Sequence, residues 1–203
     1  MATASSLSTT DLGSAAQRER RRRILDATIS TAAHGGFDAV QMRTIAERAD
    51  VALGTLYRYF PSKIHLLVSA LARQFDENRA ALERRTIPGE SPADRVMYVL
   101  TRATRGMQRD PQLTEALTRA FMFADSSVAD EIHVVGMQLT SILTRAMHGA
   151  EHVEGAEPTS EDIAIARVIS DVWLSTLVAW VTGRMSTAEV GDHLGTAVHL
   201  LLR

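Results

Sequence analysis

Residues 52–63 gather side chains that suit contact with a nucleic acid. Tyr57, Arg58 and Tyr59 follow one another and offer two hydroxyls and a guanidinium, which hydrogen-bond to phosphates and to base edges. Small residues stand at the start of this stretch, at Ala52, Gly54 and Thr55, and they let a backbone approach phosphates and bases closely. The major groove of DNA is about 12 Å wide, so only a slim helix enters it. This pattern predicts a helix that reads DNA.

Two short helices are expected to position these side chains. We predict a helix over 43–49, a tight turn at 50–52 and a second helix over 53–59, which together form a helix-turn-helix. Leu56 and Phe60 are four residues apart, so we expect them to pack inward. The other residues of the second helix are then free to face the groove.

Positive charge is concentrated near this motif. Residues 1–63 carry nine basic and six acidic side chains, a net charge of +3, although the whole chain carries −2. An arginine run at 20–23 precedes the motif, and Lys63 begins the helix after it, where its charge adds to the positive end of the helix dipole. We therefore expect this end of the molecule to meet an anion. The residues predicted to contact DNA are Arg20, Arg22, Arg23, Arg43, Thr44, Ala52, Leu53, Gly54, Thr55, Tyr57, Arg58, Tyr59 and Lys63.

The composition excludes several classes of protein. The chain has 203 residues, of which 45% are hydrophobic, and it contains no cysteine, which excludes disulfides, thiolate zinc sites and cysteine nucleophiles. No apolar run approaches the roughly 20 residues that span a bilayer. The N-terminus has neither the basic start nor the apolar centre of a secretory signal. We expect a cytoplasmic protein without a membrane partner.

The rest of the chain is typical of an all-α, two-domain protein, because no segment alternates apolar and polar residues as a strand does. We predict a disordered tail over 1–13, a helix-turn-helix domain over 14–63 and a helical ligand-binding and dimerisation domain over 64–203. An acidic, mobile connection is expected at 149–160. The other predicted helices begin near 14, 63, 92, 111, 128, 160 and 186.

Methionine and aromatic side chains recur at helical spacing in the larger domain. Such residues form adaptable walls around large apolar ligands, although an ordinary helical core has the same pattern. The residues predicted to line a ligand cavity are Met97, Leu100, Thr101, Thr104, Met107, Leu117, Phe121, Met122, Leu139, Ile142, Trp173, Leu177 and Trp180.

Residues 163–181 are apolar on more than one face, which is typical of a helix buried on both sides. One side is expected to meet the protein's own core and the other a second protomer, so that this helix and 187–202 form a four-helix dimer seam. The alternative is a helix buried within a monomer. The residues predicted to lie near the seam are Ala166, Ile169, Leu194 and Val198.

The stretch IAERADVALGTLYRYFPSKIHLL resembles the DNA-binding signature of the TetR family of bacterial repressors. The likeness spans 18–70 and includes the Gly-Gly-Phe sequence at 35–37. The segments 54–71, 107–125 and 166–184 further resemble the KstR-type subgroup, the repressors of sterol (cholesterol) catabolism.

This resemblance implies an Ω-shaped, nine-helix protomer and a homodimer that binds palindromic double-stranded DNA operators. Its recognition helices would lie about 34–36 Å apart. It also implies release from DNA by a small-molecule effector, here a steroid-derived CoA thioester, with no other cofactor. The phosphates of such an effector require arginines, and the candidates are Arg102, Arg105, Arg109 and Arg119.

Three alternatives come from other classes. An enzyme is not expected, because the chain has no nucleophile elbow, phosphate-binding glycine loop or dinucleotide fingerprint. No metal site is predicted either, although His148 and His152 have the spacing of two ligands on one helix. A TetR-type regulator of fatty-acid or lipid metabolism, or of drug efflux, would have the same first 70 residues. An architectural DNA binder would not need the methionine-rich second domain.

Overall fold

The computed structural model describes residues 9–83, 85–149 and 157–202, and every regular element in these ranges is helical. The predicted all-α, two-domain class is confirmed. The helices are α1 (Thr9–Ala39), α2 (Met42–Arg48), α3 (Leu53–Tyr59), α4 (Lys63–Glu83), α5 (Pro92–Arg109), α6 (Pro111–Met122), α7 (Ala129–His148), α8 (Ser160–Val181) and α9 (Thr187–Leu201), with a 3-10 turn, η1 (Ser126–Val128), before α7.

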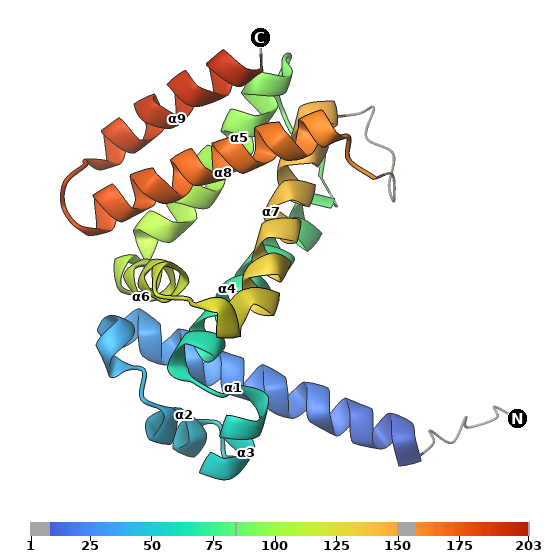
Figure 1. The fold of residues 1–203 in the computed structure, drawn as a ribbon, viewed down its shortest axis with the longest axis vertical. Helices are drawn as coiled ribbons and strands as arrows, with labels where there is room; N and C mark the ends of the chain where they lie inside the picture. The colour runs from blue at the N-terminus through green and yellow to red at the C-terminus, as the bar shows by residue number, and fades with distance from the viewer. Residues whose placement is uncertain (1–8, 84, 150–156, 203) are drawn as a thin grey trace, which may run out of the picture.

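Helices α1 to α3 form a small head at one end of the molecule (Figure 1). Ile24 of α1, Ile45 of α2 and Leu56 of α3 are fully buried in its core, and Phe60 closes the core after α3. The predicted inward packing of Leu56 and Phe60 is confirmed. Burying each such side chain stabilises the head by roughly 1.5–3 kcal/mol, which fixes the angle between two helices too short to be stable alone.

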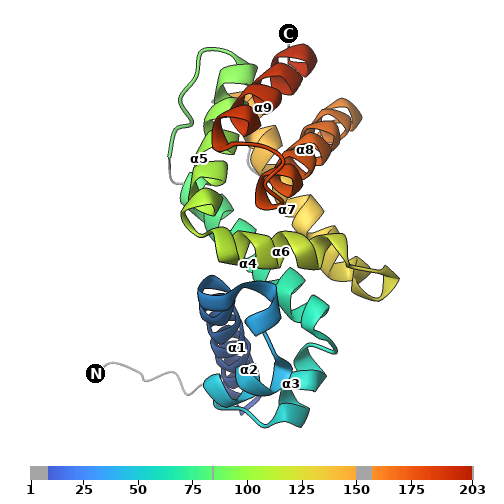
Figure 2. The same ribbon diagram turned by 90° about the vertical axis from the view of Figure 1, so that its left-hand side faces the viewer.

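Helix α4 leaves the head and enters the larger domain, where it packs against α6 and α7 (Figures 1 and 2). Helix α6 lies across the junction between the two domains, and α1 packs against it. Helices α8 and α9 lie side by side and form the outer layer farthest from the head. The larger domain is therefore a helical shell that touches the head mainly through α4 and α6.

The helix starts follow the sequence closely because polar caps mark them. Ser91, Thr159 and Ser186 each form a capping box, in which the side chain accepts a hydrogen bond from a backbone N–H three residues later and the acidic residue at that later position accepts one from the cap. The Ser62 hydroxyl accepts a hydrogen bond from the His65 N–H and caps α4. Asp110 precedes α6, but its side chain makes no cap hydrogen bond.

One boundary differs from the prediction. Helix α1 begins at Thr9, within the stretch predicted to be a disordered tail, and residues 1–8 lie outside the described ranges. Within α1, Gly35 and Gly36 leave the helical conformation, and Gly36 has φ +65°. Most of the predicted mobile connection, residues 150–156, also lies outside the described ranges.

Within the described residues, α8 is the one helix long and apolar enough to cross a membrane, by length and composition only. It packs Ala166, Ile169 and Trp173 into the interior of the protein, where each is at most 3% exposed. Its apolar character is therefore that of a helix with one face in a protein core.

Asp162 ties the start of α8 to the end of α7, and it supplies a stability prediction. Its carboxylate accepts from the Thr159 backbone N–H (2.9 Å) and hydroxyl (2.7 Å), and it lies 3.1 Å from His148 Nε2. Burial of Asp162 raises its pKa, but the hydrogen bonds from Thr159 and His148 outweigh burial, and the net pKa is lowered. The charged form is thus favoured in the folded state.

We predict that Asp162→Asn lowers the free energy of unfolding by about 1 kcal/mol at pH 7. A lowered pKa stabilises the fold above the unfolded-state pKa, and this stabilisation is lost as the pH falls through the folded-state pKa. The difference from wild type should therefore shrink as the pH is lowered from 7 toward 3, measured by urea denaturation. Glu161→Gln, an exposed change in the same turn, is the control. An equal loss at every pH would contradict the role of the charge.

Candidate nucleic-acid interface and effector cavity

Helix α3 presents an exposed, largely uncharged face to solvent. Leu53 and Tyr57 remain 38% and 46% exposed, although both are large hydrophobic side chains. Arg58 on the same helix is exposed as well, and Thr55 is half-buried. Exposure of large side chains on a short helix of this kind indicates a surface that meets a partner.

Gly54 lies in the middle of this face, in a helical position. A Cβ added to Gly54 would meet no other atom of the protein within 4 Å. Gly54 is the second residue of α3, and glycine is less favourable than alanine in a helix by up to about 1 kcal/mol. Nothing in the folded chain requires this glycine, whereas close approach of a DNA backbone would require it.

The other predicted DNA contacts are distributed around this face. Ala52 precedes α3 and is exposed, whereas Tyr59 at its end is half-buried. On α2, Arg43 is exposed and lies 4.0 Å from Glu47, and Thr44 is half-buried. Arg43 and Thr44 therefore lie at the start of α2 and Tyr59 at the end of α3, whereas Ala52 belongs to the turn between the two helices.

The arginines of α1 differ in their surroundings. Arg22 is held between Glu19 (2.7 Å) and Asp26 (3.2 Å), and Asp26 also pairs with Arg73 of α4. Arg22 therefore faces α4 rather than α3. Arg23 lies 3.6 Å from Asp50 in the turn before α3.

Arg21, a member of the predicted basic run, lies beside α3. Its guanidinium is 5.5 Å from the centroid of the Phe60 ring, directly after that helix. Arg20, which was predicted, is half-buried. Helical periodicity distinguishes Arg20 and Arg21 from Arg22. Arg20 and Arg21 stand one turn before the buried residues Ile24 and Leu25, and so lie on the same side of α1 as those residues.

Lys63 lies at the junction between the two domains. Its Nζ is 3.9 Å from the centroid of Phe37, whose other neighbour is Arg119 of α6, with the guanidinium carbon 4.4 Å from the ring centroid. Desolvation by burial lowers the pKa of Lys63, partly offset by the nearby Asp38. The sequence predicted that a helix begins at Lys63, but it did not predict that the Lys63 side chain packs against Phe37.

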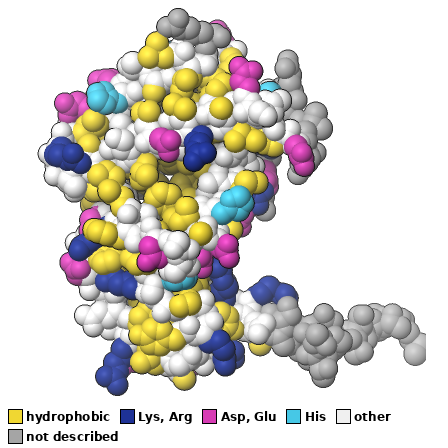
Figure 3. Space-filling view, in the orientation of Figure 1, with side chains coloured by type: hydrophobic (Ala, Val, Ile, Leu, Met, Phe, Trp, Pro, Cys, Tyr) yellow, Lys and Arg dark blue, Asp and Glu magenta, His cyan; other side chains and the backbone are white. Residues whose placement is uncertain are grey.

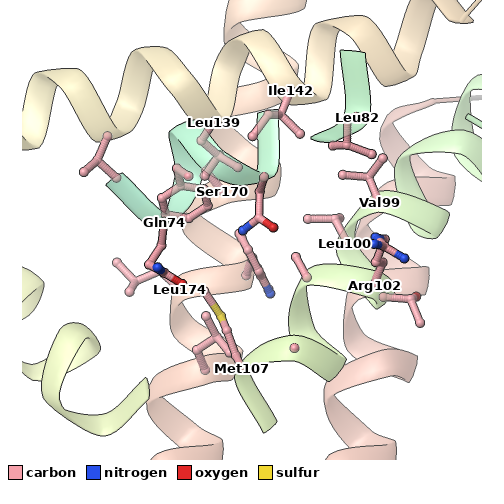
Figure 4. A pocket seen from close by; sticks show the side chains of 18 of the residues that line it. Gln74, Leu82, Val99, Leu100, Arg102, Met107, Leu139, Ile142, Ser170 and Leu174 are labelled. Atoms are coloured by element: carbon pink, nitrogen blue, oxygen red, sulfur yellow. The ribbon is translucent and has the colours of Figure 1, made fainter. Parts of the chain in front are cut away.

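The larger domain encloses a cavity of about 1410 Å³, which exceeds the roughly 300–1,000 Å³ typical of sites for drug-sized ligands. Its walls come from α4, α5, α6, α7 and α8, and apolar side chains dominate them (Figure 4). On one face of the molecule, hydrophobic side chains gather around a hollow in this domain (Figure 3). The domain can thus admit a large, mostly apolar ligand.

Most of the residues predicted for this cavity line it. They are Met97, Leu100, Thr101, Met107, Leu117, Phe121, Leu139, Ile142, Trp173 and Leu177. Three others do not. Met122 is 57% exposed at the end of α6, and Trp180 is half-buried away from the cavity. Thr104 is buried and accepts a hydrogen bond from Trp173 Nε1 at 2.9 Å, so it orients the indole that forms a wall.

Sequence reasoning missed the contribution of α4 to the cavity. Leu71, Gln74, Phe75 and Asn78 line it from this helix. Phe75 packs edge-on against Trp173, with 6.1 Å between the ring centroids. The spacing of these residues, three or four apart, was a visible signal, but α4 was interpreted only as the helix that follows the DNA-binding motif.

The four residues predicted for a dimer seam lie inside the protomer. Ala166, Ile169, Leu194 and Val198 are each at most 2% exposed, because α8 and α9 pack against each other and the core. The exposed apolar residues of these two helices are Ile163, Val168 and Leu200. The sequence correctly predicted that one face of α8 is buried, but the residues predicted for the dimer seam belong to that buried face and not to the exposed one.

Within the described ranges, no group of three or more His, Asp or Glu residues is placed to hold a metal ion. His148 forms its contact with Asp162 (3.1 Å), and His152 lies outside the described residues.

Comparison with known proteins agrees with this geometry. Residues 24–70 match the family described as bacterial regulatory proteins, tetR family, and residues 89–201 match the tetracyclin repressor-like C-terminal domain. The chain belongs to the TetR family. It is 56% identical over 199 residues to the HTH-type transcriptional repressor KstR of Rhodococcus jostii, covering 98% of this chain and 90% of that protein. It is 53% identical to KstR of Mycobacterium tuberculosis, covering 97% and 86% of the two chains.

Solved structures of TetR regulators share the fold. A TetR transcriptional regulator from Rhodococcus sp. RHA1 superposes with a TM-score of 0.82 at 35% identity, covering 92% of this chain and 97% of that one. FadR of Thermus thermophilus, solved in complex with lauroyl-CoA, has a TM-score of 0.68 at 20% identity, covering 90% and 93%. The chain is accordingly a transcriptional repressor of the TetR family, and not an enzyme.

We predict that Gly54→Ala keeps or raises stability but weakens binding to the operator by tenfold or more. Alanine favours the helix by up to about 1 kcal/mol, yet its methyl group occupies the space that a DNA backbone would fill. Thermal unfolding and fluorescence anisotropy with an operator duplex measure the two effects. Gly106→Ala on α5, where a Cβ also meets nothing, is the control and should leave DNA binding unchanged. Undiminished binding by the Gly54 variant would remove this face from the interface.

Proposed function

We propose that this protein is a dimeric, cytoplasmic repressor of sterol-catabolism genes, released from palindromic operators by a steroid-derived CoA thioester. The observation that carries the proposal is its 53–56% identity, over nearly the whole chain, to KstR repressors. The sequence resemblance described above connects this subgroup with sterol catabolism. The exposed face of α3 and the large apolar cavity are the two sites that such a repressor needs.

Helix α6 can couple effector binding to the head, because one of its faces lines the cavity and another contacts the head. Leu113, Leu117 and Phe121, spaced four apart, line the cavity. On another face, Glu115 accepts a hydrogen bond from the Phe37 backbone N–H (3.1 Å), and Arg119 lies 3.5 Å from Asp38. An effector that moves α6 would therefore move the head.

The cavity lining supports an effector with an apolar body and an anionic end. Besides its apolar walls, it includes five arginines whose side chains form no hydrogen bond or ion pair among the described residues: Arg85, Arg102, Arg105, Arg109 and Arg167. Other arginines of the larger domain, such as Arg79, are paired with carboxylates. Unpaired guanidinium groups beside an apolar space suit the phosphates of CoA. Arg119, also a candidate, is instead engaged at the domain junction.

A second candidate is a regulator of fatty-acid metabolism. FadR of Thermus thermophilus and FadR of Bacillus subtilis share the fold and were solved with lauroyl-CoA and stearoyl-CoA. A cavity of about 1410 Å³ has room for either class of acyl group. The genes beside the operator distinguish the two proposals.

The dimer that we propose uses the exposed side of α8 and α9. Val168 and Leu200 are 47% and 58% exposed there. Burying such side chains against a second copy would remove apolar area from water, worth roughly 25 cal/mol per Å². A two-fold dimer also matches the symmetry of a palindromic operator.

The function is tested by selecting genomic fragments with the purified protein and sequencing those retained. Palindromic sites beside sterol-degradation genes are expected. Sites beside fatty-acid or efflux genes would keep the repressor and reject the sterol assignment. A folded protein that enriches no site would overturn the proposal, and Tyr57→Ala, which removes an exposed side chain of α3, is the matched negative control.

We predict that Arg105→Gln/Arg109→Gln weakens binding of a steroid CoA thioester by roughly tenfold per arginine, because each charge-assisted hydrogen bond is worth about 1.5–3 kcal/mol. The thioester of the same acid with phosphate-free pantetheine should bind both proteins equally. Isothermal titration calorimetry measures both ligands, with Arg79→Gln as the control outside the cavity. If both ligands lose affinity alike, these arginines do not recognise phosphate.

A further inference from the structure

Lys63, at the start of α4, is the only lysine in the chain, and every other member of the 22 lysines and arginines is an arginine. Arginine stays protonated in proteins, whereas the amine of a buried lysine loses its proton readily and then acts as a nucleophile. The chain has no cysteine either, so it offers no thiol. Lys63 therefore carries the single side-chain amine that can react with an acyl donor.

The surroundings of Lys63 leave this amine without a carboxylate partner. Its Nζ lies 3.9 Å from the centroid of the Phe37 ring, where α1, α4 and α6 pack together (Figure 2). The two nearby carboxylates, Asp38 and Glu115, lie 3.5 and 3.6 Å from Arg119 Nη1 instead. No ion pair of Lys63 is found in the part of the chain that the structure describes. The contact that holds the ammonium group is thus the one with the ring.

Burial and neighbouring charges both act on the protonation of Lys63. Desolvation by burial lowers the pKa of Lys63, Asp38 and Glu115 raise it, Arg119 lowers it, and the net change is a fall. The neutral amine, which is the nucleophilic form, is therefore more populated than in a free lysine. Lys63 is only half-buried, so a reagent can reach it from solvent.

We propose that Lys63 is an acylation site, modified by a thioester of the CoA class, and that the modification weakens the junction between the head and the larger domain. The neutral Nζ attacks the thioester carbonyl carbon, an N–C bond forms as the C–S bond breaks, and the proton released by the amine joins the thiolate to give a free thiol. The product is an uncharged amide, which no longer forms the cation–π contact with Phe37.

Loss of this contact leaves Arg119 as the one cation over the Phe37 ring among the described residues. A weaker junction gives the head a wider range of orientations. Two heads bind a palindrome tightly only when both meet their half-sites, so this added freedom lowers the affinity for the operator. The effect on DNA binding rests on the proposed function, whereas the chemical modification does not.

The modification is tested by incubating the full-length protein with acetyl-CoA and analysing tryptic peptides by mass spectrometry. Trypsin does not cleave after an acylated lysine, so acetylated Lys63 leaves residues 59–73 as one peptide. Arg184→Lys places a second lysine at an exposed position of the same molecule and serves as the internal reference. We expect Lys63 to be acetylated faster than the introduced lysine by roughly threefold or more. Equal or slower acetylation of Lys63 would overturn the inference.

The effect on the junction is tested with acetylated protein from which acetyl-CoA has been removed, using fluorescence anisotropy and the duplex recovered by genomic selection. We expect the operator affinity to fall roughly threefold to tenfold, the factor by which a lost cation–π contact changes an equilibrium constant. The slope of log K against log salt should not change, because a lost phosphate contact would lower its magnitude by about 0.9. Lys63→Arg, which keeps a cation but no amine, should not respond to the treatment.

Phe37→Leu, verified as folded by circular dichroism, removes the ring, so acetylation of this variant should no longer change its operator affinity. An undiminished affinity of the acetylated wild type would show that the junction does not depend on the charge of Lys63. A slope lowered by about 0.9 would show that the modification removes a phosphate contact instead. If the wild type binds no operator, the repressor function fails, while the peptide analysis still decides whether Lys63 is acylated.

Discussion

The ring of Phe37 lies between two cations, Lys63 and Arg119, and this contact joins the head to the larger domain. Next to it, the Phe37 N–H donates to Glu115, and Gly36 adopts φ +65° at a point where a Cβ would come within 3.2 Å of the Glu115 carboxylate. Cation–π contacts are worth about 0.5–2 kcal/mol each, and exposed ion pairs about 0–1 kcal/mol. The junction therefore has strength comparable to the coupling energies of about 1–3 kcal/mol that connect allosteric sites. Contacts of this energy can hold the head in one orientation, and the binding energy of an effector is sufficient to change them.

This balance depends on α6 being shared by both sites. Leu117 and Phe121 belong to the cavity wall, whereas Glu115 and Arg119 belong to the junction, and all four stand within two turns of one rigid helix. A ligand cannot displace the first pair without displacing the second, because helix backbone hydrogen bonds hold their relative positions. The hydrogen bond between Trp173 and Thr104 joins α8 to α5 in another part of the cavity wall. In the function that we propose, a ligand in the cavity acts on the head through α6, the helix that belongs to both the cavity wall and the junction.

Much of this fold follows from local chemistry in the sequence. The bounds of α3 and the start of α5 agree with the prediction, because the small residues before Tyr57 mark the reading helix and Ser91 and Pro92 mark a helix start. The direction of side chains from packed helices was not predictable in the same way. Lys63 faces Phe37, and Ile169 faces the protomer's own core, because the crossing of α1, α6, α8 and α9 decides those contacts. Periodicity finds the apolar face of a helix, but only tertiary packing says which neighbour covers it.

Arginine makes the same point about charge. The chain has 22 basic residues and a net charge of −2, and the sum says little about where an anion binds. The ion pairs of each arginine determine whether it is available to an anion. Arg22 is paired with Glu19 and Asp26, whereas the side chains of the arginines that line the cavity form no ion pair among the described residues. An ion pair between exposed side chains adds little stability, so its main effect is to remove a cation from the set available to phosphates. The two anion-binding surfaces that we propose, one on the head for DNA and one in the larger domain for an effector, can therefore coexist on a protein of net negative charge, because carboxylates neutralise other arginines such as Arg22 and Arg79.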